Sequence, residues 1–209
     1  MKRFIPFFIC ILLVSTMSML TLHAQTQSSY SRTGKLDDVV GEVLRKSGSA
    51  AGLEVIAGCG AQESKAFTVS ARSIGESLND LAQSEKALTW SKDNSNSYRA
   101  TIRYTSDVGL TSIQVPAVHI EAETPVLAAD RLFAVPTVRA EIGRLGYAES
   151  PEELGFSPIR RQNHVIDLPA GTLGDDLMML ASKFGAAVWQ LDQHTCGKTR
   201  TFRLNWIAR

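Results

Sequence analysis

The sequence predicts an α+β protein made of two small modules in tandem, each with amphipathic helices packed on a short mixed sheet. The main observation is an internal repeat: residues 67–90 and 166–189 align without a gap at an offset of 99 positions. Both copies begin with a strand-like segment, continue as a capped helical pattern and end in a strand that closes with Trp. A fixed internal offset of this kind indicates one supersecondary unit used twice. The identical pairs are Ala71/Ala170, Gly75/Gly174, Leu78/Leu177, Leu81/Leu180, Ala82/Ala181, Ala87/Ala186 and Trp90/Trp189.

The first 24 residues have the pattern of a cleaved signal peptide. Lys2 and Arg3 precede the uncharged apolar stretch 4–20, and Ala24 ends an acceptable cleavage site. The alternative is a retained anchor, but a membrane-spanning helix needs about 20 apolar residues and this stretch is shorter and interrupted by Pro6. We therefore expect an exported, periplasmic protein with no membrane span in the mature chain.

The charge of the mature chain argues against nucleic-acid binding. Removing Lys2 and Arg3 from the 22 basic residues leaves 20 against 21 acidic residues, a net charge of −1. Affinity for nucleic acid depends on clustered contacts to phosphates, and a near-neutral chain lacks them. Residues 25–209 are long enough for a substantial core, whereas each half alone is small.

The first module is predicted over residues 36–104, after a polar leader at 25–35 that we expect to be flexible. Apolar residues at helical spacing predict a helix over 36–46. Strands follow at 53–57 and 66–70. The repeated unit then supplies a helix over 73–84 and strands at 87–90 and 98–104. The motif Ser73-x-x-Glu76 is an N-cap signature for that helix.

The second module is predicted over residues 113–209, after a linker at 105–112. We expect a strand at 113–120, interrupted or placed at an edge by Pro116, and helices beginning at Pro125 and Pro136. A helical turn is expected at 151–156. The repeated unit supplies a helix at 172–184, with Thr172 and Asp175 as its capping pair, and a strand at 186–189. A polar turn at 192–198 then leads to a strand at 199–206.

Residues 36–104 resemble the short N-terminal (STN) domain of secretins and TonB-dependent receptors. The opening helix LDDVVGEVLRKSG, the strand LEVIA, the FTVSARSIGESLNDLA segment and the ALTW strand carry this resemblance. Within it, Ser73, Glu76, Leu78 and Leu81 match the family's most recognisable run. Residues 166–206 match as a partial second copy. The resemblance implies a periplasmic α+β module that contacts another protein or a peptide strand at the cell envelope.

Two cysteines remain in the mature chain, Cys59 and Cys196. An exported chain meets an oxidising environment, where an even pair favours a disulfide. Because the two lie in different predicted modules, a disulfide would clamp the modules together. Two unpaired thiols in separate loops are the alternative, and the sequence leaves both open.

No group of residues has the pattern of a catalytic, cofactor or metal site. Cys196 and His194 would form only half of a zinc site, and no second ligand pair accompanies them. Asp167, Asp175 and Asp176 are interpreted as partners of a helix start rather than as acid–base catalysts. An enzyme would have to assemble its site from scattered residues such as His164, Asp167 and His194.

The function favoured by the sequence is a non-enzymatic interaction module that contacts an envelope protein through a sheet edge. The alternatives are the enzyme described above and a carrier of a small apolar ligand with a pocket between the modules. Trp90 and Trp189 are predicted to be buried beneath their helices, although both could serve as docking platforms. Of Met178 and Met179 on the second repeated helix, Met178 is expected to be the more exposed because Leu177 and Leu180 define the inward face, and gap-filling in the core is favoured over a binding role. The sequence carries no signal for an oligomeric state.

Overall fold

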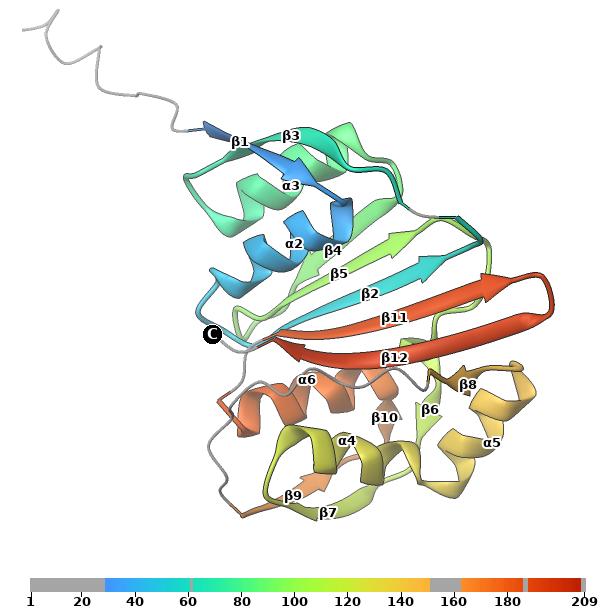
Figure 1. Cartoon of the computed structure of the whole chain (residues 1–209). Coiled ribbons are helices and arrows are strands. Elements are labelled where there is room, and N and C mark those ends of the chain that lie inside the picture. Colours follow the sequence, from blue (N-terminus) through green and yellow to red (C-terminus); the bar gives the residue numbers. More distant parts are fainter. Residues whose placement is uncertain (1–28, 61, 151–162, 186–187, 208–209) are drawn as a thin grey trace, which may run out of the picture.

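The computed structural model describes residues 29–60, 62–150, 163–185 and 188–207, and confirms the α+β class. A six-stranded mixed sheet crosses the middle of the molecule, with helices on both sides (Figure 1). Each helical layer is covered on its outer side by a two-stranded sheet. The signal peptide predicted for residues 1–24 and the helical turn predicted for 151–156 lie outside the described residues. No helix in the described part of the chain is long and apolar enough to cross a membrane.

The described residues of the first half form two helices and five strands. Their bounds are β1 Ser29–Gly34, α2 Leu36–Arg45, β2 Ala51–Ala57, β3 Lys65–Ser70, α3 Ile74–Ser84, β4 Leu88–Lys92 and β5 Tyr98–Arg103. The hydroxyl of Ser73 accepts a hydrogen bond from the Glu76 N–H, as the capping motif predicts. Leu78 and Leu81 are fully buried, which fixes the face that α3 turns to the sheet.

The second half contains three longer helices and a set of strands that includes several very short ones. A 3₁₀ turn at Leu110–Ser112 is followed by β6 Gln114–Val115, β7 Val118–Ala122, α4 Pro125–Phe133, α5 Pro136–Arg144, β8 Ala148–Glu149, β9 His164–Leu168, β10 Gly171–Thr172, α6 Leu173–Lys183, β11 Val188–Cys196 and β12 Thr199–Ile207. Thr172 and Asp175 form the predicted capping box, with bonds in both directions. Leu177 and Leu180 are buried, like their counterparts in α3.

The two halves arrange their strands in the same order. The large sheet runs β4-β5-β2-β11-β12-β8, so that three strands of the first half are followed by three of the second. In each trio an antiparallel hairpin, β4–β5 or β11–β12, is extended by a parallel strand, β2 or β8. Likewise, β1 pairs antiparallel with β3 and β7 with β9. The trios join where β2 and β11 pair in parallel over seven residues.

The molecule has two hydrophobic cores, one on each side of the shared sheet. The first packs α2 and α3 against β2, β4 and β5, and the second packs α4, α5 and α6 against β11 and β12. The strand β2 is buried along its whole length because helices cover both of its faces. The halves are therefore joined through a common sheet, which differs from the expectation of one short sheet for each module.

Two local expectations were wrong, and polar sequence misled both of them. Residues 29–34, within the expected flexible leader, form β1, where only Tyr30 packs on a core and the other side chains face outward. The expected turn at 192–198 is mostly strand, because Asp192 and Gln193 find polar partners inside the sheet. The segment at 105–112 lies between the two halves, and within it Leu110 is a fully buried residue of the second core.

Cys59 and Cys196 form a disulfide, with their Cα atoms 4.7 Å apart. Cys59 follows β2 and Cys196 ends β11, the two strands that join the halves. The bond closes a loop with a sequence separation of 137 residues. It therefore fastens the junction between the halves at one end of the β2–β11 pair.

Candidate functional site

The outer edge of the large sheet in the first half is β4, which pairs on one side with β5 and, among the described residues, with no strand on the other. An exposed edge of this kind presents unpaired N–H and C=O groups to which another strand can bind. The opposite end of the sheet is occupied by β8, a strand of only two residues. In the described part of this sheet, β4 is thus the open edge of the first half, and at the other end β8 pairs only with Thr201 and Phe202 of β12.

Hydrogen bonds at both ends of β4 show which backbone groups face outward. The Arg103 N–H donates to the Ala87 carbonyl, and the Asp93 N–H donates to the Ser97 carbonyl. In an antiparallel pair, hydrogen-bonded residues alternate with residues whose N–H and C=O point away. Odd-numbered residues of β4 therefore bond to β5, whereas the backbone groups of Trp90 and Lys92 point to the open edge.

Trp90 is held at this edge by contacts on three sides. Its indole Nε1 donates to Asn79 Oδ1 of α3 at 3.1 Å. Its ring packs against Tyr98 of β5, with the ring centroids 6.2 Å apart. The ring also lies against α3 at Gly75, where a Cβ would be at an ordinary contact distance of 3.4 Å from Trp90 Cη2. Trp90 is nevertheless only half-buried, which corrects the expectation that it would be buried like Trp189.

The corresponding edge of the second half carries an added strand. By the 99-residue offset β11 corresponds to β4, and β2 pairs in parallel along the outer edge of β11. Trp189 corresponds to Trp90 and contacts the corresponding helix residue, because its Nε1 lies 3.2 Å from Met178 Sδ. Trp189 is 2% exposed. Met178 is buried as well, which corrects the expectation that it would be the more exposed of Met178 and Met179.

A glycine of the added strand lies directly against the Trp189 ring. Gly52 of β2 is paired with Trp189 in register, and a Cβ built on Gly52 would lie 2.1 Å from Trp189 Cζ2. Cβ atoms essentially never approach a heavy atom below 3.0 Å. The close fit of the ring to the added strand therefore depends on the absence of a side chain at position 52.

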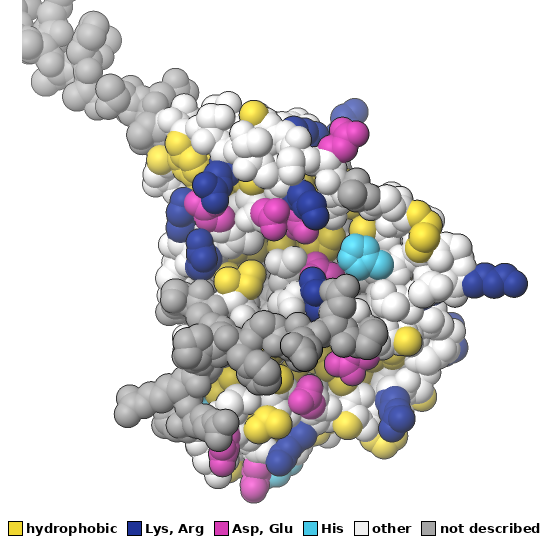
Figure 2. Space-filling view, in the orientation of Figure 1, with side chains coloured by type: hydrophobic (Ala, Val, Ile, Leu, Met, Phe, Trp, Pro, Cys, Tyr) yellow, Lys and Arg dark blue, Asp and Glu magenta, His cyan; other side chains and the backbone are white. Residues whose placement is uncertain are grey.

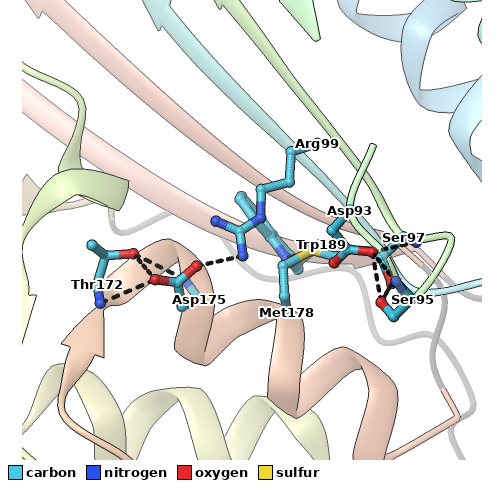
Figure 3. A network of polar contacts seen from close by, with 8 residues as sticks. All are labelled: Asp93, Ser95, Ser97, Arg99, Thr172, Asp175, Met178 and Trp189. Carbon is cyan, nitrogen blue, oxygen red and sulfur yellow. Dashed lines mark hydrogen bonds and ion pairs between the residues drawn. The ribbon is translucent and has the colours of Figure 1, made fainter. Parts of the chain in front are cut away.

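Polar contacts also bridge the two halves. Figure 3 shows Arg99 reaching from β5 to Asp175 at the start of α6, with a nitrogen–oxygen distance of 2.6 Å. The same carboxylate caps α6 through Thr172. Hydrogen bonding to Thr172 and Arg99 holds the pKa of Asp175 below its usual value, against the opposing effect of partial burial. These groups complete each other and leave no open position for a ligand.

The histidines and aspartates considered for an enzyme do not converge. His164 and Asp167 lie on opposite faces of β9, and His194 lies on β11 in a different sheet. The ring of His164 packs against Phe184. Asp167 instead pairs across the strands with His119, at 2.7 Å, and this contact raises the pKa of the histidine. This exposed His–Asp pair has no nucleophile among its contacts in the described residues.

A metal site at Cys196 and His194 is not formed, because Cys196 is in the disulfide. Within the described residues no group of three or more His, Cys, Asp or Glu side chains is arranged to hold a metal ion.

Among the described residues, Asp176 is a buried titratable group that lacks partners on both carboxylate oxygens. Its side chain is 1% exposed, and neither carboxylate oxygen has a hydrogen-bond partner. Burial, with a smaller contribution from Asp175, raises its pKa to about 7. The repeat explains its place, because Ser77 at the corresponding position of α3 donates to the carbonyls of Ser70 and Ser73. Asp176 is therefore placed where α3 has a hydroxyl donor, but it lacks the hydrogen bonds that Ser77 makes.

The cavities do not favour a carrier of apolar ligands between the halves. A small groove of about 190 Å³ lies between α2 and the β11–β12 hairpin, but its lining is mostly charged: Arg32, Asp37, Asp38, Glu42 and Arg45. A larger cavity of about 530 Å³ has an apolar floor, yet it is lined by the second half alone, including Phe133, Ile142, Tyr147 and Phe202. On the face seen in Figure 2, basic and acidic side chains are interspersed, and neither sign forms a continuous field.

Comparison with protein-family models, with curated proteins and with solved structures returned no significant match. The candidate site thus rests on the geometry of this chain. Sequence reasoning found Trp90 and Trp189 as a repeated pair but did not show that one lies at an open edge. The signal that could have revealed the difference is Gly52, a glycine inside a strand, which often marks a close approach of another group.

Proposed function

We propose that this protein is a non-enzymatic module of the cell envelope that binds an extended segment of a partner protein along the edge of β4. The observation that carries the proposal is the arrangement of the second half, where the edge corresponding to β4 is occupied by β2. An edge of the same unit therefore accepts a strand within this molecule. Pairing of a partner strand with a sheet edge is a common mode of peptide recognition.

The chemistry of the β4 edge fits this role. The outward N–H and C=O groups of Trp90 and Lys92 supply main-chain hydrogen bonds. The half-exposed Trp90 ring offers apolar area that a partner would cover, and aromatic side chains of this kind contribute strongly to interfaces. The resemblance of residues 36–104 to the STN domain, and the export signal expected at residues 1–24, support a periplasmic partner.

Blocking the edge with proline tests the proposal. Lys92→Pro removes an outward N–H without removing a hydrogen bond to β5, and proline is tolerated in edge strands. Lys92→Ala, which keeps the N–H but loses the side chain, is the matched control. Each variant is expressed with its export signal and used to capture partners from envelope extract. We expect Lys92→Ala to capture the same proteins as the wild type, more weakly because a cation at the edge is lost, and Lys92→Pro to capture none of them. Equal capture by all three would rule out the β4 edge.

A further inference from the structure

We propose that the strand bound at β4 runs parallel to it and carries the motif Gly-x-Asp/Glu, with the glycine opposite Trp90 and the acidic residue opposite Lys92. The inference rests on the proposed function and specifies the partner segment. It is drawn from the way in which β2 occupies the corresponding edge of β11, where Gly52 and Glu54 hold these two positions.

The glycine follows from the position of the Trp ring. Trp189 and Trp90 occupy corresponding strand positions, and each indole Nε1 contacts the residue eleven positions earlier, on the preceding helix. The helix thus fixes both rings through corresponding contacts. At the occupied edge the Trp189 ring fills the space where a side chain at position 52 would be. A strand that seats against Trp90 in the same way must therefore lack a side chain at that position.

The acidic residue is inferred from the register of β2 on β11 and from the charge of Lys92. Two positions after glycine, on the same face of the added strand, β2 has Glu54 opposite Leu191. The corresponding residue of β4 is Lys92. Its ammonium group lies 5.5 Å from the centre of the Tyr98 ring, and the described residues place no carboxylate within ion-pair distance of it. A carboxylate on the bound strand would pair with this cation at the rim of the interface.

The direction follows from the same comparison. β2 and β11 are parallel, with residues 51–57 paired in sequence order with residues 188–194. A parallel strand at β4 would place its amino end near Leu88 and its carboxyl end near the turn at 93–97. The proposal thus predicts which end of a bound peptide approaches that turn.

The probe is a synthetic peptide with the sequence of residues 49–58, extended by two lysines for solubility, added to the oxidised mature protein. We expect it to slow hydrogen exchange at the amides of Trp90 and Lys92 and to shift Trp90 emission to the blue, a signal that Trp90→Phe removes. Peptides with Gly52→Val or Glu54→Lys are the matched variants. We expect at least tenfold weaker binding for the first and severalfold weaker binding for the second, with the second difference decreasing at high salt.

The peptide direction is read from a spin label. A label at the carboxyl end should broaden the resonances of the turn at 93–97, whereas broadening near Glu85 and Ala87 would overturn the parallel arrangement.

If the native and Gly52→Val peptides bind equally and Lys92→Pro still blocks both, edge pairing stands and the glycine requirement is wrong. If no peptide binds while Lys92→Pro abolishes capture of an envelope protein, the motif is wrong and the proposed function stands.

A second copy of the chain is the competing occupant. Sedimentation of the wild type without peptide distinguishes a second copy of the chain from a partner strand as the occupant of the β4 edge. A concentration-dependent dimer that Lys92→Pro converts to a monomer would assign the edge to self-association and overturn the partner motif. A monomer at all concentrations, together with peptide protection at Trp90, supports it.

Discussion

Glu54 of β2 and Gln193 of β11 share a buried hydrogen bond of 3.0 Å at the junction between the two halves of the molecule. The Glu54 carboxylate also accepts from the N–H and the hydroxyl of Thr111. Gln193 in turn accepts from the Leu110 N–H at 2.8 Å. The segment that connects the halves is thus held against their shared sheet by a fully bonded network in which both side chains are buried.

Glu54→Ala should strongly destabilise the protein. The change removes both acceptor oxygens and leaves the Thr111 N–H and the Gln193 amide buried without their partner. Each unsatisfied buried group costs about 1–3 kcal/mol, so for these two groups we expect a loss of at least about 2 kcal/mol. Urea unfolding followed by circular dichroism measures it. Glu63→Ala, at an exposed glutamate, is the control and should be near neutral. Equal effects of the two changes would show that the network contributes little.

Reducing the disulfide should loosen the junction. The chain-entropy model gives about 5 kcal/mol for a loop of this length, with less expected where the reduced chain keeps structure. The double variant Cys59→Ser/Cys196→Ser should therefore unfold at a clearly lower urea concentration than the oxidised wild type. Peptide mapping without reductant provides the independent check. Two alkylatable thiols in the protein purified without reductant would contradict the bond itself.

The local parts of the fold could be predicted from sequence because their signals lie within a few residues of one another. The caps at Ser73 and Thr172, and the inward leucines of α3 and α6, are examples. The β2–β11 pairing was not predicted, because it joins residues more than 130 positions apart and no local pattern encodes a parallel partner. The same pairing makes the two edges different. Trp90 and Trp189 have equivalent local sequences, and only Trp189 is buried by an added strand.

Gly52→Ala should destabilise the protein more than the addition of one methyl group suggests. The new methyl group would overlap the Trp189 ring, and overpacking of this kind costs about 1–3 kcal/mol or more. Gly75→Ala is the matched control, because its methyl group would lie at an ordinary contact distance from Trp90 and alanine favours the helix. Thermal unfolding of the two variants compares them. A stable Gly52→Ala protein would show that the Trp189 ring can move away, and the glycine requirement proposed for the β4 edge would lose its basis.

The two tryptophans should also differ in solvent access. Acrylamide should quench the emission of Trp90 more strongly than that of Trp189, since only Trp189 is covered by an added strand. Trp90→Phe should therefore remove most of the quenchable emission. Trp189→Phe should leave it in place. The proposed edge would be closed in solution if the two variants were quenched alike.

Stability should fall as the pH rises from about 4 to about 7, because of Asp176. Its pKa in the folded protein is about 7, compared with 3.8 for the unperturbed group. Between these values the folded state binds more protons than the unfolded state, so raising the pH favours unfolding, and above about pH 7 the loss is complete. The difference corresponds to at most about 4 kcal/mol.

Asp176→Ser, which installs the residue found at position 77, should match the wild type at pH 4 and exceed its stability at pH 8. Urea unfolding at both values measures this difference, with Asp80→Asn as a control for removal of a carboxylate from a helix. If Asp176→Ser kept the wild-type slope between pH 4 and pH 7, the buried carboxyl would not be the group that titrates.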